Sequence, residues 1–257
     1  MSAPLALFAQ RQGEGPPLLL LHGLGADHQD WREVMPHLTG RYRVVAPDLR
    51  GYGASPRGPG PYSPWQMARD IEALMRAEGI TRAPVVGHSM GGAVAMSLAL
   101  LAPERVSRLV IANSVPSFRP RRPRELGEIA LRLLMIALLG PRPLGALMAR
   151  RNFPRPEQSA LRALVEARSA RNKRCVYMAS LLALTRWSVC ARLQEITMPA
   201  LVIASERDYF SVADVRSFAE ALPDARFEMV PGAHHGLPLE RGALFAELLR
   251  DFLDAPA

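Results

Sequence analysis

Short, continuously apolar segments alternate with helix-like segments along most of this 257-residue chain. Each apolar segment is hydrophobic at nearly every position, which is typical of strands covered on both faces, and their alternation with helices favours a parallel α/β sheet. The predicted strands are Pro17–Leu21, Tyr42–Ala46, Pro84–Gly87, Leu109–Asn113, Ala200–Ser205 and Phe227–Pro231. The predicted helices are Trp65–Ala77, Met90–Leu101, Val212–Leu222 and Leu239–Phe252.

The composition is that of an enzyme-sized globular chain. With 49% hydrophobic and 22% charged residues, it excludes a disordered chain and a polytopic membrane protein. No apolar run approaches the roughly 20 residues that a transmembrane segment needs. The two cysteines, Cys175 and Cys190, exclude a disulfide scaffold and lie outside any metal-binding spacing. The opening MSAPLALFAQ has no basic n-region, so we expect no signal peptide and a cytoplasmic location.

The alternation is interrupted once, between Ser114 and about Ile196, where only helical patterns rich in Arg and Pro occur. Helices inserted after a strand, with the alternation resuming afterwards, predict a lid over the carboxyl edge of the sheet. We therefore predict a core domain of residues 1–115 and 195–257 and a helical lid of residues 116–194. The most apolar part of the lid, Ile129–Leu139, is expected to cover a hydrophobic acyl pocket.

The net charge of +8 is concentrated in that insertion. Ser117–Trp187 carries 15 basic and four acidic residues, whereas the rest of the chain carries 17 basic and 20 acidic ones. A basic outer face of the lid would favour an anionic substrate, an acidic carrier or an anionic lipid surface. A simpler explanation is a solvated face in an Arg-biased composition, since 31 of the 32 basic residues are arginine. No nucleic-acid motif is present, so no nucleic-acid partner is expected.

The segment Gly87–Gly92, which reads Gly-His-Ser-Met-Gly-Gly, lies between a predicted strand and a predicted helix. A G-x-S-x-G sequence in that context is typical of a nucleophile elbow, where a sharp turn exposes the serine hydroxyl and requires small neighbours. Gly87 and Gly91 would provide that space. We predict that Ser89 is a catalytic nucleophile; the alternative is a glycine-rich turn with an incidental serine.

A serine nucleophile of this kind is followed along the chain by an acid and then by a histidine. Asp208 lies just beyond the strand Ala200–Ser205, at the edge where sheets present catalytic groups. Glu206 is the nearby competitor and is interpreted as a solvated carboxylate. After the strand Leu109–Asn113 there is no carboxylate, which favours Asp208.

The general base is expected just past the last predicted strand, where two adjacent histidines, His234 and His235, occur. Only one of them can face the serine, and the residues alone leave the choice open. The remaining histidines are interpreted as structural or surface residues: His22, His28, His37 and His88. Of these, His22 is expected to brace its own loop.

Together these segments resemble the α/β-hydrolase superfamily, in particular its lidded esterase and lactonase branch. The resemblance covers nearly the whole chain and rests on His22–Gly25, Asp48–Gly53, Gly87–Gly92 and the regions of Asp208 and His234/His235. It implies a mostly parallel central sheet flanked by helices, with the helical lid inserted after the sixth strand. Family members often open with a β-hairpin; here only Leu5–Gln10 is available, so the sheet is expected to lack its first strand.

The resemblance also implies the roles of individual residues. In the family a glutamate follows the catalytic histidine by five positions, and Glu240 has this spacing from His235. His234 then stands where the family usually has glycine. The family's oxyanion hole corresponds to the backbone amides of Leu24 and Met90. Asp48 and Arg50 are expected to brace their loop.

These expectations describe acyl transfer to water by a Ser89–His235–Asp208 triad that requires no metal and no organic cofactor. The expected partner is a small-molecule ester or acyl substrate.

Lactonase, thioesterase and perhydrolase activities use the same triad and stay open. Carbon–carbon bond hydrolases tend to have a G-x-G-P-G-like oxyanion loop, unlike Gly23–Asp27, and branches with an aspartate nucleophile are disfavoured by Ser89. A non-catalytic binding protein is the alternative from another class; acyl length, leaving group and oligomeric state stay open.

Overall fold

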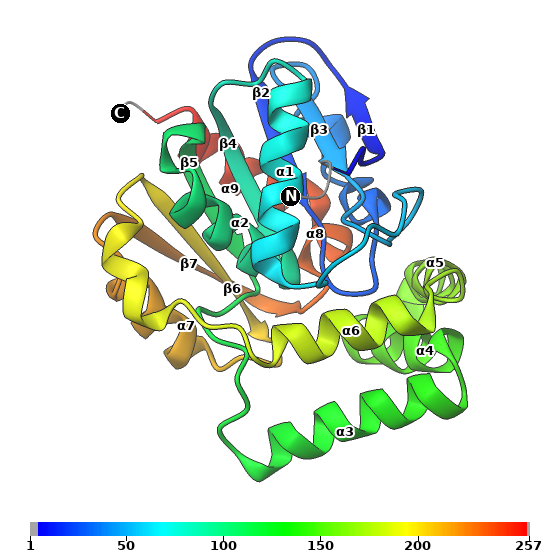
Figure 1. Ribbon diagram of the computed structural model, residues 1–257. Helices are drawn as coiled ribbons and strands as arrows, with labels where there is room; N and C mark the ends of the chain where they lie inside the picture. The colour runs from blue at the N-terminus through cyan, green and yellow to red at the C-terminus, as the bar shows by residue number, and fades with distance from the viewer. Residues whose placement is uncertain (1–4, 256–257) are drawn as a thin grey trace.

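A seven-stranded sheet forms the centre of the computed structural model, which describes residues 5–255 (Figure 1). Its strand order is β1-β3-β2-β4-β5-β6-β7; β1 runs antiparallel to β3 and every other pair is parallel. Residues 1–4 of the opening segment, in which no signal peptide is expected, lie outside this range. The strands are β1 Ala9–Gln12, β2 Pro17–Leu21, β3 Arg43–Pro47, β4 Ala83–His88, β5 Val106–Ala112, β6 Ala200–Arg207 and β7 Ala225–His234.

Helices cover both faces of the sheet, which is why its strands are continuously apolar. In β2, Leu19 and Leu21 join the core beneath one helical layer, whereas Leu18 and Leu20 join the core on the other face. The first layer contains α1 Pro64–Ala77, α2 Met90–Leu101 and α7 Val212–Glu220; the second contains α9 Gly242–Leu253 (Figure 1).

The predicted mostly parallel α/β sheet is confirmed, with differences at the element boundaries. The predicted helix Leu239–Phe252 is divided into α8 Leu237–Glu240 and α9, because Arg241 leaves the helical region with φ −141°. The last strand continues past the predicted Pro231 as far as His234, because β7 regains its pairing with β6 at Arg207 after a register shift.

The sheet opens with the single strand β1 rather than with a hairpin. This strand overlaps the end of Leu5–Gln10, the segment that the sequence offered for such a strand, and lies at the sheet edge beside β3. Since only one strand precedes β2, the helical insertion follows the fifth strand of this chain, β5, rather than a sixth.

Four helices form the insertion between β5 and β6. They are α3 Pro123–Leu138, α4 Pro141–Asn152, α5 Ser159–Ser169 and α6 Arg174–Leu184. In Figure 1, α3 is the outermost of them, and α6, which it contacts, lies between α3 and the sheet. Within residues 5–255, none of the helices combines the length and the apolar character needed to cross a bilayer.

Helix α3 is oriented differently from the expectation for Ile129–Leu139. Only Ile136 of this helix lines the cavity described below, while Leu134 and Leu138 are 57% and 68% exposed. The outer side of α3 is therefore apolar, and the expectation of a basic outer face does not hold for this helix. The run is apolar around most of the helix, so packing one side against α4 and α6 leaves the other side in solvent.

Candidate active site

The turn between β4 and α2 holds Ser89 in a strained backbone conformation. Its φ and ψ angles are 55° and −118°, in a region that non-glycine residues rarely adopt. The flanking glycines make this turn possible. A Cβ atom on Gly87 would overlap the Gly91 backbone, and one on Gly91 would overlap the Leu21 carbonyl group. The packing therefore shows that both positions require glycine, as predicted for the elbow.

Ser89, His235 and Asp208 lie in one hydrogen-bonded chain. The Oγ of Ser89 is 3.0 Å from Nε2 of His235, and Nδ1 of His235 is 2.6 Å from Oδ1 of Asp208. Asp208 follows β6 and His235 follows β7, so adjacent carboxyl ends of parallel strands bring them together. The structure thus joins all three predicted side chains. His235, and not His234, is the histidine beside Ser89.

Asp208 is buried but is surrounded by hydrogen-bond donors. Asn113 donates from Nδ2 to Oδ2 at 2.5 Å, and the backbone amide of Tyr209 donates to Oδ1 at the same distance. Burial disfavours its charged form, but His235 and these donors outweigh burial and hold the pKa of Asp208 below its usual range. Asp208 is therefore a carboxylate at neutral pH and orients the imidazole.

His88 has a role that the sequence did not reveal. The sequence indicates a structural residue, and in the structure its Nε2 donates a hydrogen bond to the carbonyl oxygen of His235 at 2.8 Å. Burial, followed by the neighbouring charge of His235, lowers the pKa of His88 to about 4. His88 is therefore a neutral donor that fixes the backbone of His235. No spacing rule in the sequence could have indicated this contact.

His234 and Glu240 hold the loop on its other side. The backbone amide of His234 donates to Oε2 of Glu240 at 2.7 Å, and its Nδ1 lies 3.1 Å from Oε1. Arg155 and Gln158 of the insertion donate to the same Oε1, at 2.7 and 3.2 Å. Burial opposes ionisation of Glu240, but these donors lower its pKa overall. Glu240 therefore acts on His235 indirectly, by fixing the preceding residue.

The loop after β2 lies directly against the serine. A Cβ atom on Gly23 would be 3.3 Å from the Cβ of Ser89, and Leu24 lines the cavity beside it. Met90 is the first residue of α2, so its amide belongs to the helical turn whose N–H groups have no intrahelical acceptor. The two residues predicted for the oxyanion hole therefore both lie next to Ser89.

The residues interpreted as bracing groups make buried contacts within the loops. His22 donates from Nδ1 to the carbonyl of Gly23 at 2.8 Å and accepts from the amide of Leu49 at Nε2, at 2.9 Å. Arg50 contacts both carboxylate oxygens of Asp70, at 2.5 and 2.8 Å. His22 therefore connects the loop after β2 to the segment after β3, and Arg50 connects that segment to α1.

Asp27, His28 and Asp48 form the single cluster within residues 5–255 that could offer three metal-ligand atoms. The two carboxylates of this cluster already accept hydrogen bonds from the protein. Asp48 accepts from the amide and Nδ1 of His28 and from the amide of Ala54, and Asp27 accepts from the amide of Gln29. The cluster is therefore accounted for as a hydrogen-bonded brace.

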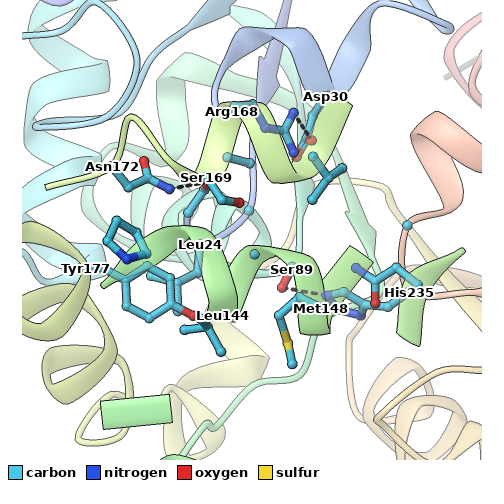
Figure 2. A pocket seen from close by; sticks show the side chains of 18 of the residues that line it. Leu24, Asp30, Ser89, Leu144, Met148, Arg168, Ser169, Asn172, Tyr177 and His235 are labelled. Carbon is cyan, nitrogen blue, oxygen red and sulfur yellow. Dashed lines mark hydrogen bonds and ion pairs between the residues drawn. The ribbon is translucent and has the colours of Figure 1, made fainter. Parts of the chain in front are cut away.

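A cavity of about 100 Å³ opens beside Ser89 between the core and the insertion. In the view of Figure 2, Leu144 and Met148 lie on one side of Ser89, and Arg168 and Asp30 lie on the other. The cavity therefore has an apolar and a polar wall. Further lining residues include Ile136, Phe153, Val165, Asn172 and Tyr177.

The polar wall joins the insertion to the core. Nη1 of Arg168, on α5, lies 2.6 Å from Oδ1 of Asp30, and both side chains are buried. Burial disfavours the charged form of Asp30, but the charge of Arg168 together with smaller contributions from neighbouring groups outweighs burial and lowers the pKa of Asp30. Within residues 5–255, Nε of Arg168 has no hydrogen-bond partner. The sequence could not single out Arg168 among the 15 basic residues of Ser117–Trp187.

A family model described as alpha/beta hydrolase fold matches residues 16–241. The chain belongs to this family. The match spans strands β2 to β7, the elbow, the insertion and the loop of His235, so the family assigned from the resemblance is confirmed.

Several known proteins are similar to this α/β hydrolase over nearly its whole length. The Caulobacter segnis protein RutD, named for carbamate hydrolysis, is 34% identical over 92% of this chain and 91% of its own. An enol-lactonase from Burkholderia xenovorans LB400 superimposes with a TM-score of 0.89 at 26% identity, over 98% of this chain and 99% of that one. An esterase from Thermogutta terrifontis has a TM-score of 0.86 at 25% identity, over 96% and 93%.

Proposed function

We propose that this α/β hydrolase is a serine hydrolase that cleaves a carboxylic ester of a small substrate through an acyl-enzyme on Ser89. The observation that carries the proposal is the chain of two hydrogen bonds from Ser89 through His235 to Asp208, at 3.0 and 2.6 Å. A serine hydroxyl needs such a base and such an orienting acid to act as a nucleophile at neutral pH.

In the first half-reaction, the Oγ of Ser89 attacks the ester carbonyl carbon while Nε2 of His235 accepts the hydroxyl proton. Asp208 stabilises the resulting imidazolium, which it can do because it is ionised and hydrogen-bonded to Nδ1. The tetrahedral intermediate then collapses, the ester C–O bond breaks, and His235 transfers its proton to the leaving alcohol. Ser89 is left carrying the acyl group.

In the second half-reaction, His235 removes a proton from water, which attacks the acyl-enzyme carbonyl. Collapse of this second intermediate releases the carboxylic acid and returns the proton to Ser89. In both intermediates the negative oxygen would accept from the amides of Leu24 and Met90. Loss of one such donor typically costs about 3 kcal/mol of transition-state stabilisation.

The cavity supports a small substrate. Its volume of about 100 Å³ has room for a short acyl or alcohol group. Leu144 and Met148 would contact apolar atoms of the substrate, and Arg168 would contact a polar one. We further propose that residues 116–194 act as a cap on a core of residues 1–115 and 195–257. The support is that α3 to α6 contribute residues to both walls of this cavity, Leu144 and Met148 to the apolar one and Arg168 to the polar one.

Carbamate hydrolysis is the second candidate, because the similarity to RutD spans 92% of this chain. Attack on a carbamate carbonyl would use the same nucleophile and base, and the N–H groups of a carbamate could donate to Asp30 on the polar wall. Lactones are a third substrate type with the same bond chemistry. Thioesters and carbon–carbon bonds stay alternatives that no residue of the site favours.

A substrate panel tests the proposal. Purified protein is assayed against short and long p-nitrophenyl esters, a γ-lactone, an alkyl carbamate and an acyl thioester, each in parallel with Ser89→Ala. We expect the highest kcat/KM for a short ester and its loss in Ser89→Ala. A higher kcat/KM for the carbamate, also lost in Ser89→Ala, would replace the ester assignment. Turnover that survives Ser89→Ala would contradict the mechanism.

A further inference from the structure

The side of α3 that faces away from the protein is apolar along its whole length. We call Leu126, Leu131, Leu134, Leu138 and Leu139 the outer face of α3; their exposed fractions are 57%, 40%, 57%, 68% and 60%. Leu126, Leu134 and Leu138 repeat at multiples of four residues, which places them in one row along the helix. The positions between them on this side, Gly127, Ala130 and Ala137, are also exposed and carry no charge.

Packing within residues 5–255 does not explain this face. The opposite side of α3 already supplies the internal contacts, because Ile136 is fully buried and packs with Leu144 and Tyr177. The charged side chains of the middle of the helix lie on that other side as well, where Arg132 contacts Glu128 at 3.4 Å. A helix that is apolar on both sides normally has a partner on both. Contiguous exposed apolar residues of this kind indicate an interaction surface.

Arginines flank the outer face at both ends of α3. Arg119, Arg121, Arg122 and Arg124 are exposed around its first turn. At its other end, Arg174 donates from Nη1 to the carbonyl of Ala137 at 3.1 Å.

Helix stability does not account for the four arginines at the beginning of α3, because cations at a helix N-terminus oppose the helix dipole. The nearest acid, Glu125, is engaged by the backbone amides of Arg121 and Arg122 through Oε2, at 2.6 and 3.2 Å. The positive end of the dipole and the arginine side chains therefore act in the same direction. They make this end of α3 a strong attractor for anions.

We propose that the outer face of α3 binds an anionic lipid surface, with the leucines in the acyl-chain boundary and the flanking arginines against the headgroups. An apolar stripe with basic residues beside it is the pattern of helices that lie in a membrane interface. A second copy of this chain fits less well, because two such faces in contact would bring their arginines together. Docking of α3 is independent of the reaction at Ser89, since none of these leucines or arginines lines the cavity.

Co-sedimentation with vesicles tests this surface on the full-length protein. The probes are vesicles of phosphatidylcholine alone and of phosphatidylcholine mixed with phosphatidylglycerol. One variant, Leu134→Ser with Leu138→Ser, removes apolar contact; its control is Leu101→Ser with Leu244→Ser, two exposed leucines on α2 and α9. A second variant replaces Arg121, Arg122 and Arg124 by Gln; its control replaces Arg69, Arg76 and Arg82, outside the insertion, by Gln.

We expect the unaltered protein to sediment with the anionic vesicles and not with phosphatidylcholine alone. The leucine variant should bind at least about tenfold more weakly, because two leucines no longer enter the interface. Each arginine lost should weaken binding by about fivefold, and high salt should reduce binding of the unaltered protein. Both control variants should bind as the unaltered protein does, and circular dichroism should show the same helix content in all five proteins.

Three results would overturn the proposal. The first is no sedimentation with anionic vesicles, and the second is equal binding by the leucine variant and its control. The third is that analytical ultracentrifugation finds a dimer that Leu134→Ser with Leu138→Ser converts to a monomer, which would assign the outer face of α3 to a second copy. Vesicle binding lost only in the α3 variants supports a lipid surface.

Discussion

Ser89 combines backbone strain with a position at the start of a helix. Holding a non-glycine residue at φ 55° costs roughly 1–3 kcal/mol, and the surrounding contacts must offset that cost. Its amide donates to the carbonyl of Ala112 at 2.9 Å, and its carbonyl accepts from Oγ of Ser114 at 2.8 Å. The hydroxyl is therefore fixed beside His235 before any substrate binds, as the proposed attack on a carbonyl carbon requires.

The two adjacent histidines are expected to differ sharply in their contribution to the reaction. His235→Ala removes the group that accepts the proton of Ser89, so kcat should fall by about four orders of magnitude or more. His234→Ala leaves the backbone amide that donates to Glu240, so kcat should fall by less than about tenfold. Steady-state kinetics on one activated ester checks both variants. A greater loss in His234→Ala would contradict the assignment of the base.

His88 is expected to position His235 without titrating in the neutral range. With a pKa of about 4, His88 stays uncharged while it donates to the carbonyl of His235. His88→Leu removes that donor and should lower kcat by about tenfold, whereas His88→Gln retains an N–H at a similar place and should stay closer to the unaltered protein.

The pH dependence of kcat/KM separates this positioning role from proton transfer. Its shape should be the same in the unaltered protein, His88→Leu and His88→Gln. A displaced acid limb in His88→Leu would show that His88 changes its charge during the reaction.

At the scale of residues, the sequence predicts the catalytic candidates whose order along the chain and spacing from neighbouring motifs are characteristic. Ser89 is identified by the glycines around it, and Asp208 by its place after a strand. The donors to these groups could not be predicted. Asn113 reaches Asp208 from 95 positions away and His88 reaches the carbonyl of His235 from 147 positions away, through contacts that only the folded sheet creates.

Among the elements, the segment from β7 to α8 determines where His235 lies. Glu240, in the last turn of α8, is fully buried at its carboxylate and accepts hydrogen bonds from His234, Arg155 and Gln158. It therefore connects the loop of His235 to the insertion. Because these donors act on the charged form, the contribution of Glu240 to stability should depend on pH.

Glu240→Gln is expected to lower the free energy of unfolding by roughly 1–3 kcal/mol at neutral pH. Since folding lowers the pKa of Glu240, its stabilising effect is present above the ordinary glutamate pKa and is lost as the pH falls through the lower folded value. Urea unfolding at a series of pH values should therefore show the two proteins converging in acid. Glu247→Gln, on the exposed side of α9, is the control and should show little difference at any pH. A difference for Glu240→Gln that is independent of pH would contradict this account.

Most elements could be predicted because their apolar patterns are unambiguous. β2 has four leucines in succession, and the bounds of α2 agree with the prediction at both ends. The orientation of α3 could not be predicted. The one charged residue of its apolar run, Arg132, lies on the inner side and does not mark the solvent-facing surface, so only the packing of Ile136 reveals which side is inside.

On the scale of the whole molecule, two ion pairs with buried carboxylates are among the contacts that join the core and the insertion. The ion pair of Arg168 with Asp30 connects α5 to the segment after β2, and Arg155 with Glu240 connects the insertion to α8. Both pairs have buried carboxylates, so separating the two parts would leave buried charges without partners, which is costly. These ion pairs therefore help to hold the insertion over the cavity.

The central claim is that Ser89, activated by His235, forms a covalent intermediate. Labelling with a fluorophosphonate followed by peptide mass spectrometry tests it most directly, because the Oγ of Ser89 attacks phosphorus, fluoride leaves and the adduct persists. We expect one adduct, on the peptide that contains Ser89, with none in Ser89→Ala and labelling slowed by orders of magnitude in His235→Ala. An adduct on another residue, or an unlabelled protein whose Ser89→Ala variant still hydrolyses esters, would contradict the claim.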